Sequence, residues 1–247
     1  MNKLATVIVN RNCLSFTKNL LIDLSKQDNR DFDIILIDNN SDEDGTDEYL
    51  SHIESNTPHK VIRNSSNKSL NKIWNECVRN YEYEYISFLN NDIRIPKNFI
   101  DDNIKILDKE TNVACVIHAT NHPSYSKVKD VLDYVLLSPK TRVRQGWDFT
   151  IKTKHWLPIP ESLQFYCGDD FIFEMILRRN LNVAVAISSP IIHYQGMTRK
   201  SAKSNVDKQI REIAMKDITE YKRLGFTHVW EQLSPYSKMH PTFKSFT

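Results

Sequence analysis

The stretch TVIVN at residues 6–10 decides the fold, together with DIILI at 33–37 and YISFL at 85–89. Each is a short apolar run, rich in β-branched residues, that ends abruptly in polar ones, which is typical of a buried strand. Residues 14–27 and 70–77 carry apolar side chains at helical spacing. Strands that alternate with helices pair in parallel through right-handed crossovers. The sequence therefore predicts an α/β fold with a doubly wound, mostly parallel sheet and helices on both faces.

The same reasoning extends along the rest of the chain. Apolar runs predict strands at 60–63, 113–117 and 183–187, and helical spacing predicts helices beginning at Pro96 and over 169–179 and 204–224. Periodicity fades between 119 and 145, which indicates a long loop. Regularity returns at 147–152.

The composition limits the possible classes of protein. A chain of 247 residues with 40% hydrophobic residues can bury one sizeable core. No apolar run approaches the roughly 20 residues that span a bilayer, and the first residues lack a signal-peptide core, so we expect a cytoplasmic protein with no transmembrane segment. The four cysteines include no CxxC pair, which disfavours a zinc site or a disulfide framework. A net charge of +2 indicates no general attraction to nucleic acid, although 199–223 is locally basic.

Glycine is scarce, with five residues that stand far apart at 45, 146, 168, 196 and 225. Neither a GxGxxG fingerprint nor a Walker phosphate loop can be assembled from them. A bound nucleotide would therefore need its phosphates neutralised by a metal ion and by side-chain cations.

Polar clusters follow three of the predicted strands, at Asn10–Asn12, Asp38–Asn40 and Asn90–Asp92. One such cluster would be ordinary turn chemistry, since Asn and Asp favour turns. Three clusters on the same rim of a sheet predict a ligand site, because open α/β sheets bind ligands at the carboxyl ends of their strands.

Six segments together resemble a known family: TVIVNRN, DIILIDNNSDEDGT, NKSLNKIWN, YISFLNNDIRIP, YCGDDFIFEMILRRN and IIHYQGMT. In order and spacing they resemble the family-2 glycosyltransferases of the GT-A fold, and most closely the rhamnosyltransferase-like branch. The resemblance implies a glycosyltransferase domain over 1–200, with a nucleotide-binding half at 1–118 and an acceptor half at 119–200. A C-terminal helix and tail would follow at 201–247.

The resemblance implies a metal site at Asp92 and His193. Asp92 stands where the family holds a divalent cation, with Asn90 in place of a common aspartate, and His193 stands where a C-terminal histidine closes the site. One carboxylate fewer weakens binding, but hard cations accept carboxylate, phosphate and water oxygens, so Mn²⁺ or Mg²⁺ is the expected cofactor. The alternatives are a turn cap for Asp92 and a structural role for His193.

The resemblance also places a nucleotide-sugar donor beside the first two strands. Asp38 would contact the base or ribose, and Asn39 replaces an acid common in uridine-using members. An amide both donates and accepts, so Asn39 still fits the uracil or thymine of a UDP- or dTDP-sugar. Asn10 and Arg11 would complete the pocket, although Asn10 is equally well explained as a helix cap. Further donor-binding candidates are Asn67, Lys72, Asn90, Asn91, Arg199 and Lys200.

The acidic pair Asp169 and Asp170 corresponds to the family's catalytic carboxylates. Asp170 would deprotonate the acceptor hydroxyl in a single inverting displacement, with Asp169 as its neighbour. Acids are also favoured in the first turn of any helix, which is the alternative. The aromatic residues Trp147, Trp156 and Tyr166 precede this pair and fit either sugar contact or core packing.

Other functions stay open at this stage. A nucleotidyltransferase could share the sheet and metal site, but its triphosphate loop is not found here. A receiver-like domain could use Asp38 as phosphoacceptor, and a non-catalytic nucleotide-sugar-binding module is a third alternative. The acceptor could be a glycan, a lipid-linked sugar, a protein or a modified nucleic-acid base, because a basic C-terminal helix does not decide between them.

Overall fold

The computed structural model describes residues 2–43, 45–121, 127–137, 145–194 and 204–226. Strands in these ranges are β1 (Leu4–Asn10), β2 (Phe32–Asp38), β3 (Lys60–Arg63), β4 (Tyr85–Asn90), β5 (Ile93–Arg94), β6 (Val113–Thr120), β7 (Tyr134–Leu136), β8 (Asp148–Lys152) and β9 (Asn182–His193). Helices are α1 (Leu14–Leu24), α2 (Thr46–Asn56), α3 (Leu70–Asn80), α4 (Phe99–Lys109), α5 (Gly168–Arg178) and α7 (Ser204–Arg223), with the 3-10 turn η2 (Thr153–His155).

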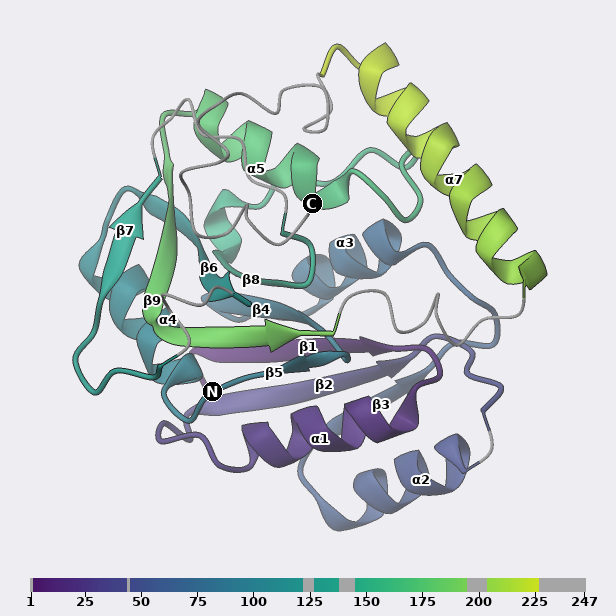
Figure 1. The fold of residues 1–247 in the computed structure, drawn as a ribbon, viewed down its shortest axis with the longest axis horizontal. Helices are drawn as coiled ribbons and strands as arrows, with labels where there is room; N and C mark the ends of the chain where they lie inside the picture. The colour runs from purple at the N-terminus through teal and green to yellow at the C-terminus, as the bar shows by residue number, and fades with distance from the viewer. Residues whose placement is uncertain (1, 44, 122–126, 138–144, 195–203, 227–247) are drawn as a thin grey trace.

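The strands described form one sheet in the order β3-β2-β1-β4-β8-β6-β9-β5, with β7 beside β9 (Figure 1). Pairing is parallel from β3 through β4, as the alternation of strands and helices predicts. In this register Asn10 lies beside Asp38, and Val9 beside Asn90. The three polar clusters therefore meet at one edge of the sheet.

The other half of the sheet is mixed, since β6 and β9 pair in parallel while their other neighbours are antiparallel. β8 runs antiparallel to both β4 and β6, and β5 and β7 run antiparallel to β9. A parallel neighbour needs a long crossover, usually a helix, and the residues described between β6 and β8 contain no helix. The chain passes through β5, α4 and β6 between β4 and β8, so the antiparallel pairing of these two strands is not the result of a short connection.

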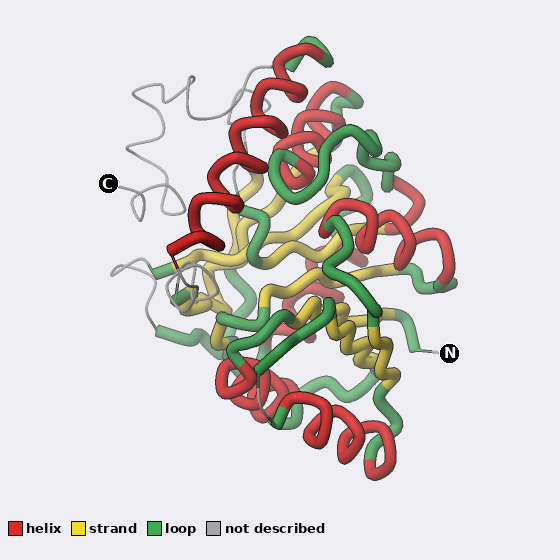
Figure 2. Tube along the Cα trace, turned by 90° about the vertical axis from the view of Figure 1, so that its right-hand side faces the viewer, coloured by secondary structure: helices red, strands yellow, loops and turns green. Residues whose placement is uncertain are grey.

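Helices cover both faces of the sheet, as predicted (Figures 1 and 2). α1, α2 and α4 pack on one face through residues such as Leu20, Leu50 and Phe99. α3, α5 and α7 pack on the other, where Trp74, Phe173 and Tyr221 are buried. The central strands are buried on both sides, so Val7 belongs to one core and its neighbour Ile8 to the other. Burying each such side chain stabilises the fold by roughly 1.5–3 kcal/mol.

The helix α7 is part of this packing. Tyr221 near its end is 2% exposed, and Ile218 and Leu224 pack against the same core. None of the helices in the described ranges has the length and apolarity needed to cross a membrane.

Candidate active site

Asn10 lies at the centre of the polar edge of the sheet. It is fully buried, and its amide donates to Asp38 Oδ1 at 3.1 Å and to Ser41 Oγ at 3.0 Å. Its oxygen accepts from Thr17 Oγ1 and, at 3.1 Å, from Asn91 Nδ2. Two donors and two acceptor positions are the full capacity of an amide. Asn10 and Asn91 thus hold three segments together. The contact with the donor predicted for their side chains stays a prediction.

Asn39 is bonded in the same way. It donates to Asn67 Oδ1 and to the carbonyl of Lys68, each at 2.9 Å. It accepts from Asn64 Nδ2 at 3.1 Å and from the Lys68 N–H at 2.9 Å. The described residues thus use every hydrogen-bonding position of this amide, and Asn39 holds the 64–68 loop. Its contact with the base stays a prediction.

The acidic segment after β2 shapes the start of α1. Asn12 and Cys13 both have left-handed backbones, with φ of 57° and 56°. Asn12 and Asp42 bond each other twice, through Asn12 Nδ2 to Asp42 Oδ1 at 2.6 Å and Asp42 N to Asn12 Oδ1 at 2.9 Å. The first helical N–H, that of Leu14, donates to Glu43 Oε2 at 2.9 Å. A distant carboxylate caps this helix rather than a residue next to it.

Two cations at this edge have no hydrogen bond or ion pair among the residues described. Arg11 is partly exposed beside Asn10, and Lys72 is exposed in the first turn of α3. Ser69 caps that helix by accepting from the Lys72 N–H at 3.3 Å. The side chains of Arg11 and Lys72 are therefore available for an anion. Arg199 and Lys200 lie outside the described residues.

Asp92 and His193 come together at the end of the sheet. His193 Nε2 lies 3.3 Å from Asp92 Oδ1, and the Tyr194 N–H donates to the Asp92 carbonyl at 3.0 Å. The pairing of Ile93 with His193 in the β5–β9 ladder fixes this approach. Both side chains are buried, Asp92 with 6% and His193 with 9% of its surface exposed. Residues a hundred positions apart thus meet as the sequence predicts.

The imidazole of His193 is oriented from two sides. Trp147 stacks on it, with ring centroids 4.8 Å apart and the planes inclined by 20°. Trp147 Nε1 donates to Thr120 Oγ1 at 3.1 Å, which fixes the indole. Asn121 bonds the His193 backbone in both directions, at 2.8 and 3.0 Å. Of the two roles considered for Trp147, packing is therefore the one observed.

The donor atoms of Asp92 and His193 fit a shared divalent cation. Two atoms bound side by side to an octahedral ion, each about 2.1 Å away, lie about 3 Å apart. The Asp92–His193 separation of 3.3 Å is close to this value. Across the described ranges no group of three or more His, Cys, Asp or Glu side chains is placed to hold a metal. The remaining positions on such an ion would thus fall to ligand oxygens and water, as is usual for Mg²⁺ on phosphates.

The acidic pair lies in the first turn of α5, where this helix approaches Gly146 and the start of α3. A Cβ on Gly146 would meet Asp169 Oδ2 at 3.0 Å, so Asp169 packs on the residue next to Trp147. A Cβ on Gly168 would meet Asn71 Oδ1 at 2.0 Å, so α5 begins directly against α3. The periodic patterns of the sequence do not predict these close approaches, although isolated glycines in a glycine-poor chain are the signal that could have indicated them. They bring the acids, the Asp92–His193 pair and the first turn of α3 together.

Asp170 is more deeply buried than its neighbour, with 4% of its surface exposed. Burial, and then the nearby carboxylate of Asp170, raise the pKa of Tyr221. Asp170, in the first turn of α5, therefore lies near Tyr221 on the buried face of α7.

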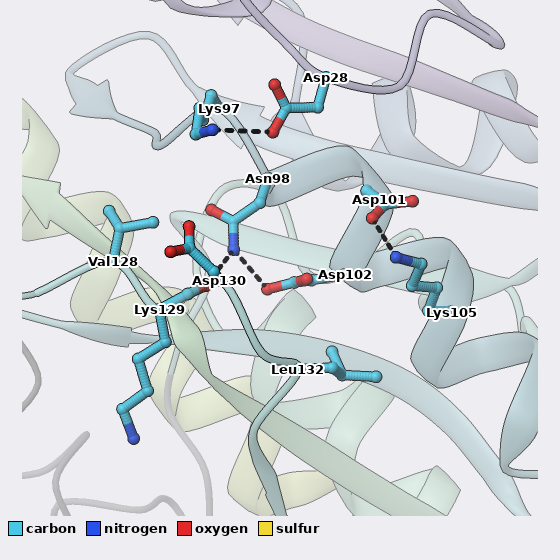
Figure 3. Close-up of a pocket in the computed structure, with 10 residues that line it drawn as sticks. All are labelled: Asp28, Lys97, Asn98, Asp101, Asp102, Lys105, Val128, Lys129, Asp130 and Leu132. Atoms are coloured by element: carbon cyan, nitrogen blue, oxygen red, sulfur yellow. Dashed lines mark hydrogen bonds and ion pairs between the residues drawn. The ribbon is translucent and has the colours of Figure 1, made fainter.

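A cavity of about 100 Å³ opens elsewhere, at the opposite end of α1 (Figure 3). Asp28 lines it and follows the C-terminal end of α1, whereas the candidate site precedes the N-terminal end. Its charges are paired: Asp28 lies 3.5 Å from Lys97 and Asp101 lies 2.6 Å from Lys105. This cavity is not part of the candidate site.

Solved structures share this architecture. GalNAc-T7 with UDP, GalNAc and Mn²⁺ superposes with a TM-score of 0.63 at 16% identity, over 78% of this chain and 43% of that one. TarS 1–349 from S. aureus gives 0.61 at 14% identity, over 89% and 71%. Its complex with UDP-GlcNAc gives 0.62 at 16% identity, over 87% and 66%. The chain thus spans less than half of the GalNAc-T7 chain, and identities this low show the fold alone.

Sequence comparison gives the family. A search of curated proteins found no match. The family described as Glycosyl transferase family 2 matches residues 6–176, well over half of the 247. The rhamnosyltransferase-like branch stays a prediction. With the GT-A architecture of its structural neighbours, this match shows that the chain belongs to glycosyl transferase family 2.

Proposed function

We propose that this protein transfers a sugar from a UDP- or dTDP-sugar to an acceptor hydroxyl, with inversion at the anomeric carbon. The observation that carries the proposal is the convergence of Asp92, His193 and the Asp169–Asp170 pair at one edge of the sheet, linked through Gly146 and Trp147. When a hydroxyl displaces a nucleoside diphosphate from a sugar, cations are needed to stabilise the charge on the leaving diphosphate, and a base is needed to take the proton of the hydroxyl.

The donor diphosphate fits the cationic side of the edge. Arg11 and Lys72 have no partner among the described residues, so they can make charge-assisted bonds to phosphate without breaking others. Asp38 is our candidate contact for the base or ribose, since its carboxylate oxygens can accept further bonds beyond those from Asn10 and Ser41. The UDP in the neighbouring TarS and GalNAc-T7 structures supports a uridine donor.

Asp92 and His193 would hold Mn²⁺ or Mg²⁺. The ion would neutralise charge that develops on the leaving diphosphate, a role that usually contributes several kcal/mol to the rate. Trp147 and Asn121 keep the imidazole in place for this role.

Asp170 would act as the base. Its carboxylate accepts the proton of the acceptor hydroxyl while the hydroxyl oxygen bonds to the anomeric carbon. The bond to the nucleoside diphosphate breaks on the opposite face, so the anomer is inverted. Asp169, partly exposed beside Gly146, would orient the acceptor. An aspartate is a weak base at neutral pH, so proton transfer must accompany attack.

The receiver-like alternative is disfavoured because it gives no role to the Asp92–His193 pair or to the acids at the start of α5. The acceptor molecule is left unassigned, since glycan, lipid-linked sugar, protein and nucleic-acid base all offer a suitable nucleophile.

The test is a panel of UDP- and dTDP-sugars incubated with Mn²⁺ and scored for slow release of free sugar, which needs no acceptor. We expect one donor to be hydrolysed, with the rate lost on chelation and strongly reduced in Asp92→Asn but unchanged in the cavity variant Asp28→Asn. Tight binding of every donor without turnover would favour a binding module. Pyrophosphate release from a nucleoside triphosphate would favour a nucleotidyltransferase.

A further inference from the structure

The helix α7 lies beyond the family match at 6–176, yet it contacts the segment that leads to the acidic pair. Asp217 on α7 is 2% exposed. Its carboxylate accepts three consecutive backbone N–H groups, from Gln164 at 3.0 Å, Phe165 at 2.8 Å and Tyr166 at 2.9 Å. Bonds to an ionised acceptor are roughly twice as strong as neutral ones.

The opposite side of this segment is held by α3. Asn71 Nδ2 donates to the carbonyls of Leu163 at 3.1 Å and Tyr166 at 3.2 Å, and its N–H donates to the Gln164 carbonyl at 3.2 Å. Ser69 Oγ also donates to the Gln164 carbonyl. The N–H groups of residues 164–166 are therefore bonded to α7, and the carbonyls of the same segment are bonded to the start of α3 and its N-cap.

This segment determines where α5 begins. The residue before the helix, Cys167, has a left-handed backbone with φ of 60° and makes no side-chain cap. Gly168 follows in contact with Asn71, and the acidic pair comes next. Without a local cap, the direction of the first turn of α5 depends on the bonds that fix 163–166.

Aromatic packing fixes α7 in turn. Phe226 stacks on Tyr221 with ring centroids 4.9 Å apart, and meets Phe171 edge-on at 5.5 Å. Arg178 of α5 lies over the Phe226 ring at 4.7 Å. α7 is thus anchored to the helix that carries Asp170, and Asp217 is its polar contact with the preceding segment.

We propose that Asp217 is a positioning residue, which holds the 164–166 backbone so that Asp169 and Asp170 face the acceptor. The proposal rests on the glycosyltransferase function above. An asparagine in its place has one acceptor oxygen, and its amide nitrogen cannot accept a hydrogen bond from an N–H. The three-way bond therefore needs the carboxylate.

The test compares Asp217→Asn with Glu212→Gln, which changes an exposed acid of the same helix. Donor hydrolysis by water in the presence of Mn²⁺ gives kcat and the donor KM, and hydrogen exchange reports on the 164–166 amides. We expect Asp217→Asn to lower kcat by about 10- to 100-fold, as small misplacements of reacting groups do. The donor KM should change less than twofold and amide exchange should become faster, while Glu212→Gln behaves as wild type.

Asp217→Glu keeps the carboxylate one methylene further out, and should lose less activity than Asp217→Asn. Wild-type kcat in a well-folded Asp217→Asn would overturn the proposal, as would a loss that appears only in KM. Unchanged exchange of the 164–166 amides in Asp217→Asn would overturn it as well, and this measurement needs no enzymatic activity. Failure of the wild-type protein to release sugar from any donor would instead contradict the proposed glycosyltransferase function.

Discussion

Buried amides explain how single residues build the rim of the site. Asn10 and Asn39 follow strands that the sequence places correctly, and both are candidates for donor contact on sequence alone. The structure shows a role for them within the chain, because Thr17, Asn64 and Lys68 complete their hydrogen bonds. A sequence shows that an amide stands at a strand end. It does not show which distant group will occupy that amide.

Asn39→Ala should therefore act through stability. Removing the amide leaves the N–H of Lys68 and the side chain of Asn64 unpaired, at a cost of about 1–3 kcal/mol for each buried group that water does not reach. We expect urea denaturation to show this loss, with donor affinity weakened equally for UDP and CDP. Ser65→Ala in the same loop is the control. Unchanged stability together with altered base preference would mean that Asn39 reads the base.

Asp170→Asn tests the base directly. It should lower kcat by about 10²–10⁴-fold, because general base catalysis contributes on this order. The affinity for the nucleotide should be unchanged, since the role proposed for Asp170 is toward the acceptor. Glu161→Gln, an exposed acid ahead of α5, serves as the control. Full activity in Asp170→Asn would refute the assignment.

At the scale of elements, the sequence predicts those that carry an apolar pattern of their own. The strands at 60–63 and 148–152 and the start of α3 are found where sequence periodicity indicates them. α2 was not predicted, because it buries little more than Leu50 and Ile53 beneath a highly polar sequence. β5 has two residues and no pattern of its own, yet its pairing with β9 brings His193 to Asp92. A strand this short is recognised only from its pairing with β9 in the structure.

The contact between β6 and Trp147 supports the proposed metal site. In Thr120→Val the indole N–H of Trp147 loses its acceptor, so the ring that stacks on His193 is less well fixed. We expect Mn²⁺ affinity, measured by electron paramagnetic resonance, to fall about tenfold, as for other residues that orient metal ligands. Thr150→Val removes a buried hydroxyl bond on β8, to Ser87, and should leave Mn²⁺ affinity intact. An equal loss of Mn²⁺ affinity in the two variants would mean that Thr120 acts only through the stability of the fold.

The contribution of Glu220 on α7 to the stability of the fold should decrease at acidic pH. Hydrogen bonds from Arg223 and then from Ser162 lower the pKa of Glu220 from 4.5 to about 2. A lowered folded-state pKa means that the stabilising effect is present above pH 4.5 and is lost as the pH falls toward 2. The difference in melting temperature between wild type and Glu220→Gln should therefore shrink across this range. A constant difference would show that the charge of Glu220 is not involved.

At the scale of the whole molecule, the site is assembled by long-range packing. The alternation of strands and helices predicts the sheet and the edge where ligands bind. It does not predict that Gly146 leaves room for Asp169 of α5, or that Gly168 lets the start of α5 lie against Asn71 of α3. Nor does it predict that α7, beyond the family match, contributes Asp217 to the same region. These contacts depend on pairs of residues far apart in the chain, which a periodic pattern does not encode.

The central claim is that Asp92 and His193 bind one cation together with the donor diphosphate, beside the acidic pair. The most direct measurement is anomalous diffraction from crystals grown with Mn²⁺ and UDP. We predict one strong peak about 2.2 Å from both Asp92 and His193 and from diphosphate oxygens. A well-ordered UDP with the manganese peak elsewhere, or with Asp92 and His193 in contact with each other but not with the metal, would contradict the account.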